Sequence, residues 1–240
     1  MLLALLIVKL DKVENCPYCL CAKVVGNGKK SSGAHNYLCK GCGKQFQKHY
    51  LYWACDKKVK DQILPMLLRG SGVRDCAVVL GISPNAVLRH LTRQAQAVVI
   101  KPKQSRYHKV QIDELWSYVG NKDKKVWLLY AYCAESKEIL GFSMGKRSTK
   151  TVKNLMVKLK GLEVDFYCTD DWEAFRSVLP YYQHLIGKRF TRAIEGVNTF
   201  FRTRVRRLVR KTICFSKKVY NHYAMIKLII YHRNNPLSYI

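Results

Sequence analysis

The sequence predicts an α+β multidomain protein, in which an N-terminal zinc ribbon and a helix-turn-helix precede a layered C-terminal α/β domain. Three observations support this fold class: two Cys-x-x-Cys pairs, a helical stretch with a capped turn, and strand-like segments interleaved with helical ones. The length of 240 residues leaves room for one sizeable core and one or two small modules. We expect the ribbon over residues 1–55, the helix-turn-helix over 56–95, a linker over 96–108 and the larger domain over 109–240.

Four of the ten cysteines form two pairs, and 19 residues separate Cys19 from Cys39. Two residues between thiolates allow both members of a pair to reach one tetrahedral Zn²⁺. We therefore predict one structural zinc held by Cys16, Cys19, Cys39 and Cys42. The alternatives are a redox pair or disulfides, which a reducing compartment disfavours. Cys21 is close enough to compete as a ligand.

The next segment has the pattern of paired helices. Val59, Ile63 and Leu67 recur at four-residue spacing, and Pro65 between them is expected to kink or restart the helix. Ser83-Pro84 supplies an N-cap and a first-turn proline for a later helix. A tight helical hairpin of another kind could show the same pattern. The polar side chains of that later helix expected to reach base edges or phosphates are Asn85, Arg89 and Arg93.

The charge of the chain is extreme. Lys and Arg total 43 against 16 Asp and Glu, a formal net charge of +27, which indicates a polyanionic partner: nucleic acid, or an anionic membrane surface. Nothing acidic follows Glu195 over the last 45 residues, so this region is expected to contact phosphates. The cations expected to hold DNA there are Arg202, Arg206, Arg207, Arg210 and Lys211. The apolar run over residues 1–8 is too short to span a membrane and lacks signal-peptide features, so we expect a cytoplasmic protein.

The larger domain begins with segments rich in aromatic and β-branched residues. The strands expected there cover residues 110–119, 126–133, 138–144 and 164–168, and the helices cover 149–160 and 190–211. The second strand is an unbroken apolar run of eight, as expected of a strand covered on both faces.

Three carboxylates are placed where they could do chemistry. Asp113 interrupts the first strand, Asp170 follows the end of a later strand, and Glu195 lies on the basic helix. Carboxylates from two strands and a helix can converge on two Mg²⁺ ions about 3.5–4 Å apart. One ion would activate a water or a 3′-hydroxyl, and the other would stabilise the departing 3′ oxygen.

Each carboxylate also has a purely structural interpretation. Asp113 could pair with Lys124 or Lys125, Asp170 could cap a helix that starts near Trp172, and Glu195 could pair with Arg192. From the residues alone, a metal-dependent nuclease or strand-transferase and a DNA-binding protein both stay open.

Several ordered motifs resemble a known family over nearly the whole length. They include Cys16-Pro-Tyr-Cys19, Leu88-Arg89-His90-Leu91, Asp113-Glu114-Leu115-Trp116, Thr169-Asp170-Asp171-Trp172, Ile194-Glu195, and Arg210-Lys211-Thr212-Ile213. In these the chain is similar to the transposase of the insertion-sequence-one family of bacterial and archaeal mobile elements.

The resemblance implies an RNase H-like catalytic core with the Asp-Asp-Glu triad Asp113, Asp170 and Glu195, which would bind two Mg²⁺ (or Mn²⁺) ions. Arg202 matches a basic position that would contact substrate phosphate, and His222 matches a C-terminal histidine with a packing, DNA-contact or catalytic role. It implies a DDE transposase that binds terminal inverted repeats, cleaves 3′ ends and transfers them into target DNA. The partners would be double-stranded DNA and further copies of the chain, at the prokaryotic nucleoid.

One position departs from the family pattern. Gly196 follows the glutamate, where the family usually has arginine, and glycine inside a helix costs about 1 kcal/mol. The alternatives are therefore a DNA-binding repressor of the element or a catalytically decayed copy. A nuclease acting on RNA–DNA hybrids is a further alternative, disfavoured by the DNA-reading modules upstream.

Overall fold

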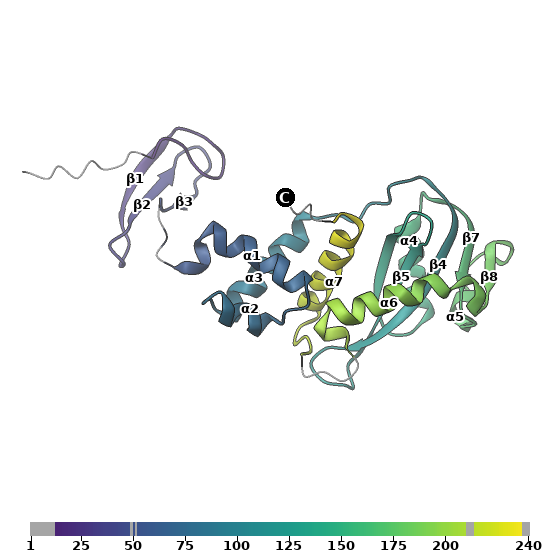
Figure 1. Ribbon diagram of the computed structural model, residues 1–240. Coiled ribbons are helices and arrows are strands. Elements are labelled where there is room, and N and C mark those ends of the chain that lie inside the picture. The colour runs from purple at the N-terminus through teal and green to yellow at the C-terminus, as the bar shows by residue number, and fades with distance from the viewer. Residues whose placement is uncertain (1–12, 49, 51, 210–213, 237–240) are drawn as a thin grey trace, which may run out of the picture. The chain divides into compact units, whose positions relative to one another are not determined.

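The computed structural model describes residues 13–48, 50, 52–209 and 214–236, which belong to two compact units, Met1–Lys57 and Lys58–Ile240 (Figure 1). The apolar run over residues 1–8 and the predicted DNA contacts Arg210 and Lys211 lie outside the described residues. No helix in the described part of the chain combines the length and the apolar character that a membrane crossing requires.

The first unit is an antiparallel three-stranded sheet in the order β1 (Val24–Lys29), β2 (His35–Cys39), β3 (Gln45–Phe46). A single 3₁₀ turn, Trp53–Cys55, follows it. Its buried cluster consists of Cys16, Cys39 and Phe46, with partly buried side chains around it. A cluster this small buries too little apolar surface to stabilise a domain alone, so the unit needs a further source of stability.

The second unit begins with three helices: α1 (Lys57–Leu68), α2 (Val73–Val79) and α3 (Pro84–Ala97). The predicted cap is confirmed, because Ser83 Oγ accepts the Ala86 N–H at 3.2 Å. Of the two outcomes expected at Pro65, a kink or a restart, the restart does not occur, since α1 runs through the proline. Ile63 and Leu67, on either side of Pro65, are both fully buried, and their packing outweighs the backbone hydrogen bond that proline removes.

A five-stranded mixed sheet follows, in the order β6-β5-β4-β7-β8. Its strands are β4 (Arg106–Tyr118), β5 (Lys125–Cys133), β6 (Glu138–Gly145), β7 (Glu163–Thr169) and β8 (His184–Ile186). β4 pairs antiparallel with β5 and parallel with β7, so it is the centre of the sheet. β5 is buried from Leu128 to Cys133, as the apolar run predicted.

Helices cover both faces of this sheet (Figure 1). On one face α4 (Thr149–Leu159) and α5 (Glu173–Arg176) pack on a core that contains Ile112, Leu129 and Phe175. The other face carries α6 (Arg192–Arg204) and α7 (Val219–Asn234). The remaining 3₁₀ turns are Tyr181–Gln183, Lys188–Phe190 and Arg206–Leu208.

The predicted helix over residues 190–211 was too long. α6 ends at Arg204, where Val205 turns to an extended conformation and a 3₁₀ turn follows. Val205 and Leu208 are both buried, so the chain bends to pack them against the body of the unit.

The segment over residues 96–108, expected to be a linker, is held to the sheet. The Lys103 N–H donates to Glu138 Oε1 at 3.0 Å, and Lys103 Nζ donates to the Asn234 carbonyl at 2.9 Å. α3 itself contacts α7, where Lys227 Nζ donates to the Ala95 carbonyl at 2.8 Å. The three N-terminal helices therefore belong to the same compact unit as the sheet.

Candidate metal centre and carboxylate site

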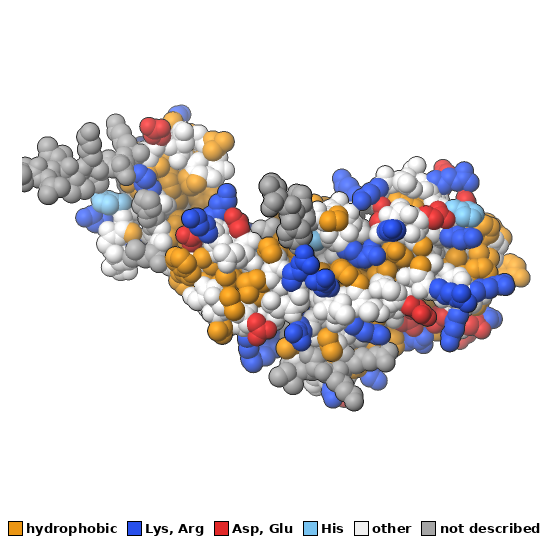
Figure 2. Space-filling model, viewed as in Figure 1, with side chains coloured by type: hydrophobic (Ala, Val, Ile, Leu, Met, Phe, Trp, Pro, Cys, Tyr) orange, Lys and Arg blue, Asp and Glu red, His pale blue; other side chains and the backbone are white. Residues whose placement is uncertain are grey.

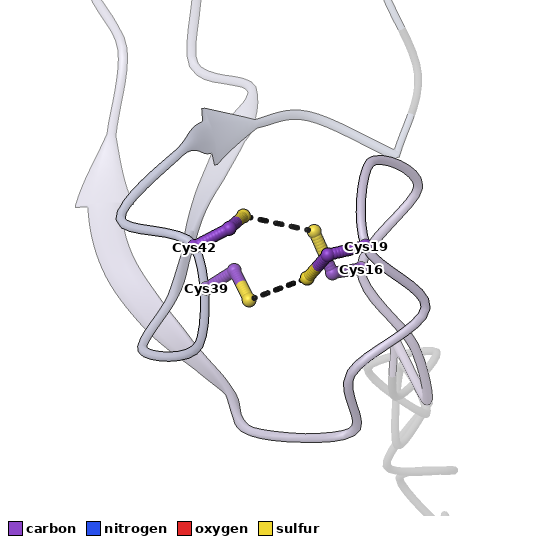
Figure 3. A group of neighbouring side chains, drawn as sticks. All are labelled: Cys16, Cys19, Cys39 and Cys42. Atoms are coloured by element: carbon purple, nitrogen blue, oxygen red, sulfur yellow. Dashed lines mark hydrogen bonds between the residues drawn. The ribbon is translucent and has the colours of Figure 1, made fainter.

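The four predicted cysteines come together in the first unit. Their sulfur atoms all lie within 4.8 Å of one another, and two knuckle turns direct them at a common point (Figure 3). Cys16 Sγ lies 3.7 Å from Cys42 Sγ, and Cys19 Sγ lies 3.6 Å from Cys39 Sγ. Four sulfurs at the usual Zn–S distance in a tetrahedron are about 3.8 Å apart. The donor set therefore fits a four-thiolate zinc.

The electrostatics of the cluster favour thiolate. This holds for Cys39, where a backbone N–H···S hydrogen bond from Cys42 lowers the pKa of the thiol to about 6. At Cys19 a backbone hydrogen bond from Cys21 lowers the pKa, but burial and the neighbouring thiols outweigh it and raise the pKa to about 12, so this sulfur would need the metal to become a thiolate. Cys21, the competing ligand, does not belong to the group of four, and its sulfur accepts the Lys23 N–H at 3.3 Å instead.

The strand register brings two of the predicted catalytic carboxylates side by side. Gln111 on β4 pairs with Cys168 on the parallel strand β7; Asp113 follows two residues later on β4, and Asp170 follows two residues later, just beyond the end of β7. Burial raises the pKa of Asp113, and the negative charge of Asp170 raises it further, whereas a hydrogen bond from Asn198 lowers it. Two like charges, one inside β4 and one just after the end of β7, are a donor set that a divalent cation would stabilise.

Helix α6 is fixed above these strands by a chain of hydrogen bonds. Gln111 Oε1 accepts the Ile194 N–H at 2.8 Å. Tyr130 Oη donates to Asn198 Oδ1 at 2.7 Å, and Asn198 Nδ2 donates to Asp113 Oδ2 at 2.6 Å. Sequence reasoning did not assign these three polar side chains to the site. For Asn198 the sequence did contain an indication, because it lies three residues after Glu195 on a helix that also carries Arg202.

The third carboxylate and its basic neighbour are on α6. Glu195 lies in the first turn and is exposed, next to the anchored Ile194. The charge of Arg202 lies near enough to Asp113 to favour its ionised form. Among the described residues, the side chains close enough together to bind one metal ion are the four cysteines. The carboxylates of Asp113, Asp170 and Glu195 lie farther apart than this criterion allows.

The structural alternatives for these carboxylates find no support among the described residues. Lys125 pairs with Tyr118 in the β4–β5 register, well along the strand from Asp113. The helix after Asp170 has Trp172 as its N-cap and no side-chain cap. The ion pairs between described side chains include none between Glu195 and Arg192.

The predicted DNA-binding side chains differ in their exposure to solvent and in their hydrogen bonds. Asn85, Arg89 and Arg93 are exposed along α3, while Val87 and Leu91 of the same helix are fully buried. Arg206 is exposed, although its Nε donates to the Gly70 carbonyl at 3.0 Å. Figure 2 shows basic side chains in several separate groups over the larger unit.

Arg207 belongs to an internal polar network with His222. Its guanidinium donates to Ser216 Oγ at 3.0 Å and to the Asn221 carbonyl at 2.9 Å, and burial lowers its pKa to about 10. His222 lies between Ser216 and Ser117 at 3.0 Å from each, and burial lowers its pKa to about 3. A fully buried, neutral His222 holds α7 to β4.

An ion pair holds the segment between β6 and α4 to β4, beside Asp113 in sequence. Glu114 projects to the sheet face opposite Asp113, where Arg147 Nε and Nη2 donate to its Oε1 at 2.9 and 2.7 Å. The Arg147 guanidinium also lies 4.2 Å from the ring centroid of Trp172, which follows Asp170 closely in the chain. Arg147 therefore clamps the end of β7 to β4.

Replacing Arg147 with alanine is expected to destabilise the second unit by about 2–3 kcal/mol. The Glu114 side chain is only 7% exposed, so without Arg147 it would be a buried, unpaired charge. Because Arg147 itself is 39% exposed, the expected loss of stability is smaller than the roughly 3–5 kcal/mol that breaking a fully buried ion pair costs. Urea unfolding measures the loss. Adding Glu114→Gln, which removes the buried charge, is expected to recover most of it; no recovery would contradict the clamp.

Together these features define a strongly basic, mixed α/β protein with a four-cysteine cluster and with acidic side chains on β4 and just after the neighbouring parallel strand β7. The family model described as IS1 transposase matches residues 109–234, which carry all three carboxylates. The chain belongs to the IS1 transposase family, as the sequence motifs predicted.

Named relatives agree with this assignment. The chain is 39% identical over 120 residues to the insertion element iso-IS1n protein InsB of Shigella dysenteriae, over 50% of this chain and 92% of that protein. It is 36% identical over 146 residues to the insertion element IS1 protein InsB of Escherichia coli, over 58% of this chain and 87% of that protein. Among solved structures, the chain aligns with one from a simian T-cell lymphotropic virus intasome in complex with PP2A regulatory subunit B56 gamma. The alignment has a TM-score of 0.35 and 12% sequence identity, and it covers 71% of this chain and 66% of that chain.

Proposed function

We propose that the chain is a DDE transposase that cleaves the 3′ ends of its own insertion sequence and joins them to target DNA. The observation that carries this proposal is the register of β4 and β7, which runs to Gln111 and Cys168, two residues before Asp113 and Asp170, and supports a shared position for the two carboxylates. Membership of the family supports the same chemistry. The core would be RNase H-like, and the mixed sheet with helices on both faces supports that fold.

The three carboxylates would hold Mg²⁺ or Mn²⁺, two ions per site. When bound, these ions supply Lewis-acid activation of a water or a 3′-hydroxyl and stabilise the departing oxygen. The chain itself contributes the positions of the ligands: Asn198 fixes the orientation of the Asp113 carboxylate through its 2.6 Å hydrogen bond. Arg202 would hold the substrate phosphate beside Asp113, whose charge it already neutralises in part.

The first 97 residues would select the DNA. We propose that α3 reads the terminal inverted repeats with Asn85, Arg89 and Arg93, which are exposed on one side of a helix whose other side is buried. The four-thiolate zinc would stabilise the ribbon that accompanies it. Because two ends of the element must meet, at least two copies of the chain would act together on DNA.

A transposition assay in cells, with the gene in its native flanking DNA, tests the proposal. We expect movement with the wild-type chain and none with Asp113→Asn, which keeps an acceptor for Asn198 but removes the charge. Binding to the flanking ends, measured in parallel, is expected to be equal for both. Movement by Asp113→Asn would contradict the proposal.

The same assay separates the alternatives. A wild-type chain that binds the ends without movement would indicate a repressor or a decayed copy. Gly196→Arg would then be the next variant, because a Cβ at Gly196 meets nothing within 4 Å and the helix can accept a side chain there. Recovery of movement would identify the missing arginine as the cause.

A further inference from the structure

The second unit has a cationic groove that the proposed function does not use. It has a volume of about 700 Å³ and lies beside the turn that joins β4 to β5. Five cations line it: Lys124, Lys125, Lys146, Arg147 and Lys217. Among the described residues of the lining, Asp123 is the one carboxylate.

The groove is built from chain segments that are distant in sequence. Val119 forms a parallel bridge to Ser216, and the Gly120 N–H donates to the Ser216 carbonyl at 2.8 Å, which brings Lys217 beside the turn. The Val119 N–H donates to the Lys124 carbonyl at 3.1 Å and closes the turn itself. Hydrogen bonds therefore fix the backbone from which these lysines project.

Most of the charge in the groove is uncompensated. Arg147 is neutralised by Glu114, as described above. The four lysines are exposed, and the ion pairs found between described side chains include none of them. Four ammonium groups around one groove repel each other, and an anionic ligand would remove that repulsion.

We propose that this groove holds the phosphate backbone of a DNA segment outside the acidic site, an inference that rests on the proposed function. Arg147 lines the groove and binds Glu114 on the face of β4 opposite Asp113, so the groove approaches β4 from the other side of the sheet. From Glu114 to Val119 the strand extends about 17 Å. This is the axial length of about five phosphates of one DNA strand. Lysines contact phosphates as flexible point charges without reading sequence, so the groove takes DNA of any sequence.

The test compares two double variants of the full chain. Lys124→Gln/Lys125→Gln neutralises the groove, and Lys153→Gln/Lys160→Gln removes the same charge from exposed positions on α4 and at its C-terminal cap, outside the groove. Fluorescence anisotropy measures affinity against salt for two duplexes, one with a terminal repeat and one unrelated. The groove variant is expected to bind about tenfold or more weakly, with a salt slope smaller by about two, and the control is expected to match wild type.

The two duplexes identify the source of the DNA. A loss confined to the terminal repeat assigns the groove to the element end, and a loss confined to the unrelated duplex assigns it to target DNA. If the groove variant and the control variant show the same dependence of DNA affinity on salt with both duplexes, the inference is overturned and the proposed function is unaffected. A weakened groove variant combined with a wild-type chain that never cleaves would uphold the groove and reject the proposed function.

Discussion

Replacing Asp170 with asparagine is expected to abolish cleavage of the element ends, whereas the same change at the neighbouring Asp171 leaves cleavage near wild type. β7 ends at Thr169, and its register with β4 sets Asp170 on the same sheet face as Asp113. Asp171 is one residue further and forms an ion pair with Arg176 instead. We therefore expect Asp170, whose charge acts on Asp113, to be the carboxylate that shares a cation with it.

The expected loss for Asp170→Asn is at least about a thousandfold, because the site loses several kcal/mol of charge stabilisation. Asp171 and Arg176 are both largely exposed, so breaking their ion pair costs less than about 1 kcal/mol. Cleavage of a labelled terminal-repeat duplex in Mg²⁺ measures the rates. An equal loss in both variants would show that the segment as a whole, and not one carboxylate, is required.

Replacing Cys39 with serine is expected to reduce bound zinc from about one equivalent per chain to near zero and to unfold the first unit. Apart from the cluster itself, Phe46 is the large side chain buried there, so little else holds the sheet together. Structural zinc contributes about 10–16 kcal/mol in small zinc-dependent folds. The second unit has its own core and is expected to unfold as in wild type.

The matched control is Cys21→Ser. Cys21 lies close to the cluster in sequence but not among the four converging sulfurs, so this variant is expected to keep its zinc. Zinc content by mass spectrometry and thermal unfolding by circular dichroism give the two readouts. Full metal content in Cys39→Ser, or equal loss in both variants, would contradict the four-thiolate assignment.

The features that the sequence predicted are those with a local cause. The cysteine pairs, the Ser83 cap and the apolar run of β5 each depend on residues a few positions apart. Two departures arose where distant packing overrides a local rule: α1 continues through Pro65, and α6 ends at Arg204, after which the chain turns and buries Val205. Local propensity carries no information about such contacts.

The polar framework of the site was missed for the same reason. Asn198 meets Asp113 across 85 positions, and Arg147 meets Glu114 across 33. Helix α7 was missed because it is apolar around much of its circumference, with buried residues such as His222, Ile226 and Ile230. A helix that is buried on several sides lacks the apolar periodicity of three to four residues by which an amphipathic helix is recognised.

The position of α7 has a consequence for how the chain is made. Its contact between Lys227 and Ala95 spans 132 residues, and Asn234 binds the backbone of Ile139 on β6 across 95. During synthesis α1, α2, α3 and the sheet leave the ribosome before α7, which packs against them last. Such long-range closure is slow, and the waiting surfaces are exposed in the meantime. Chain termination before Val219 would therefore leave these surfaces permanently uncovered and yield a product prone to aggregate.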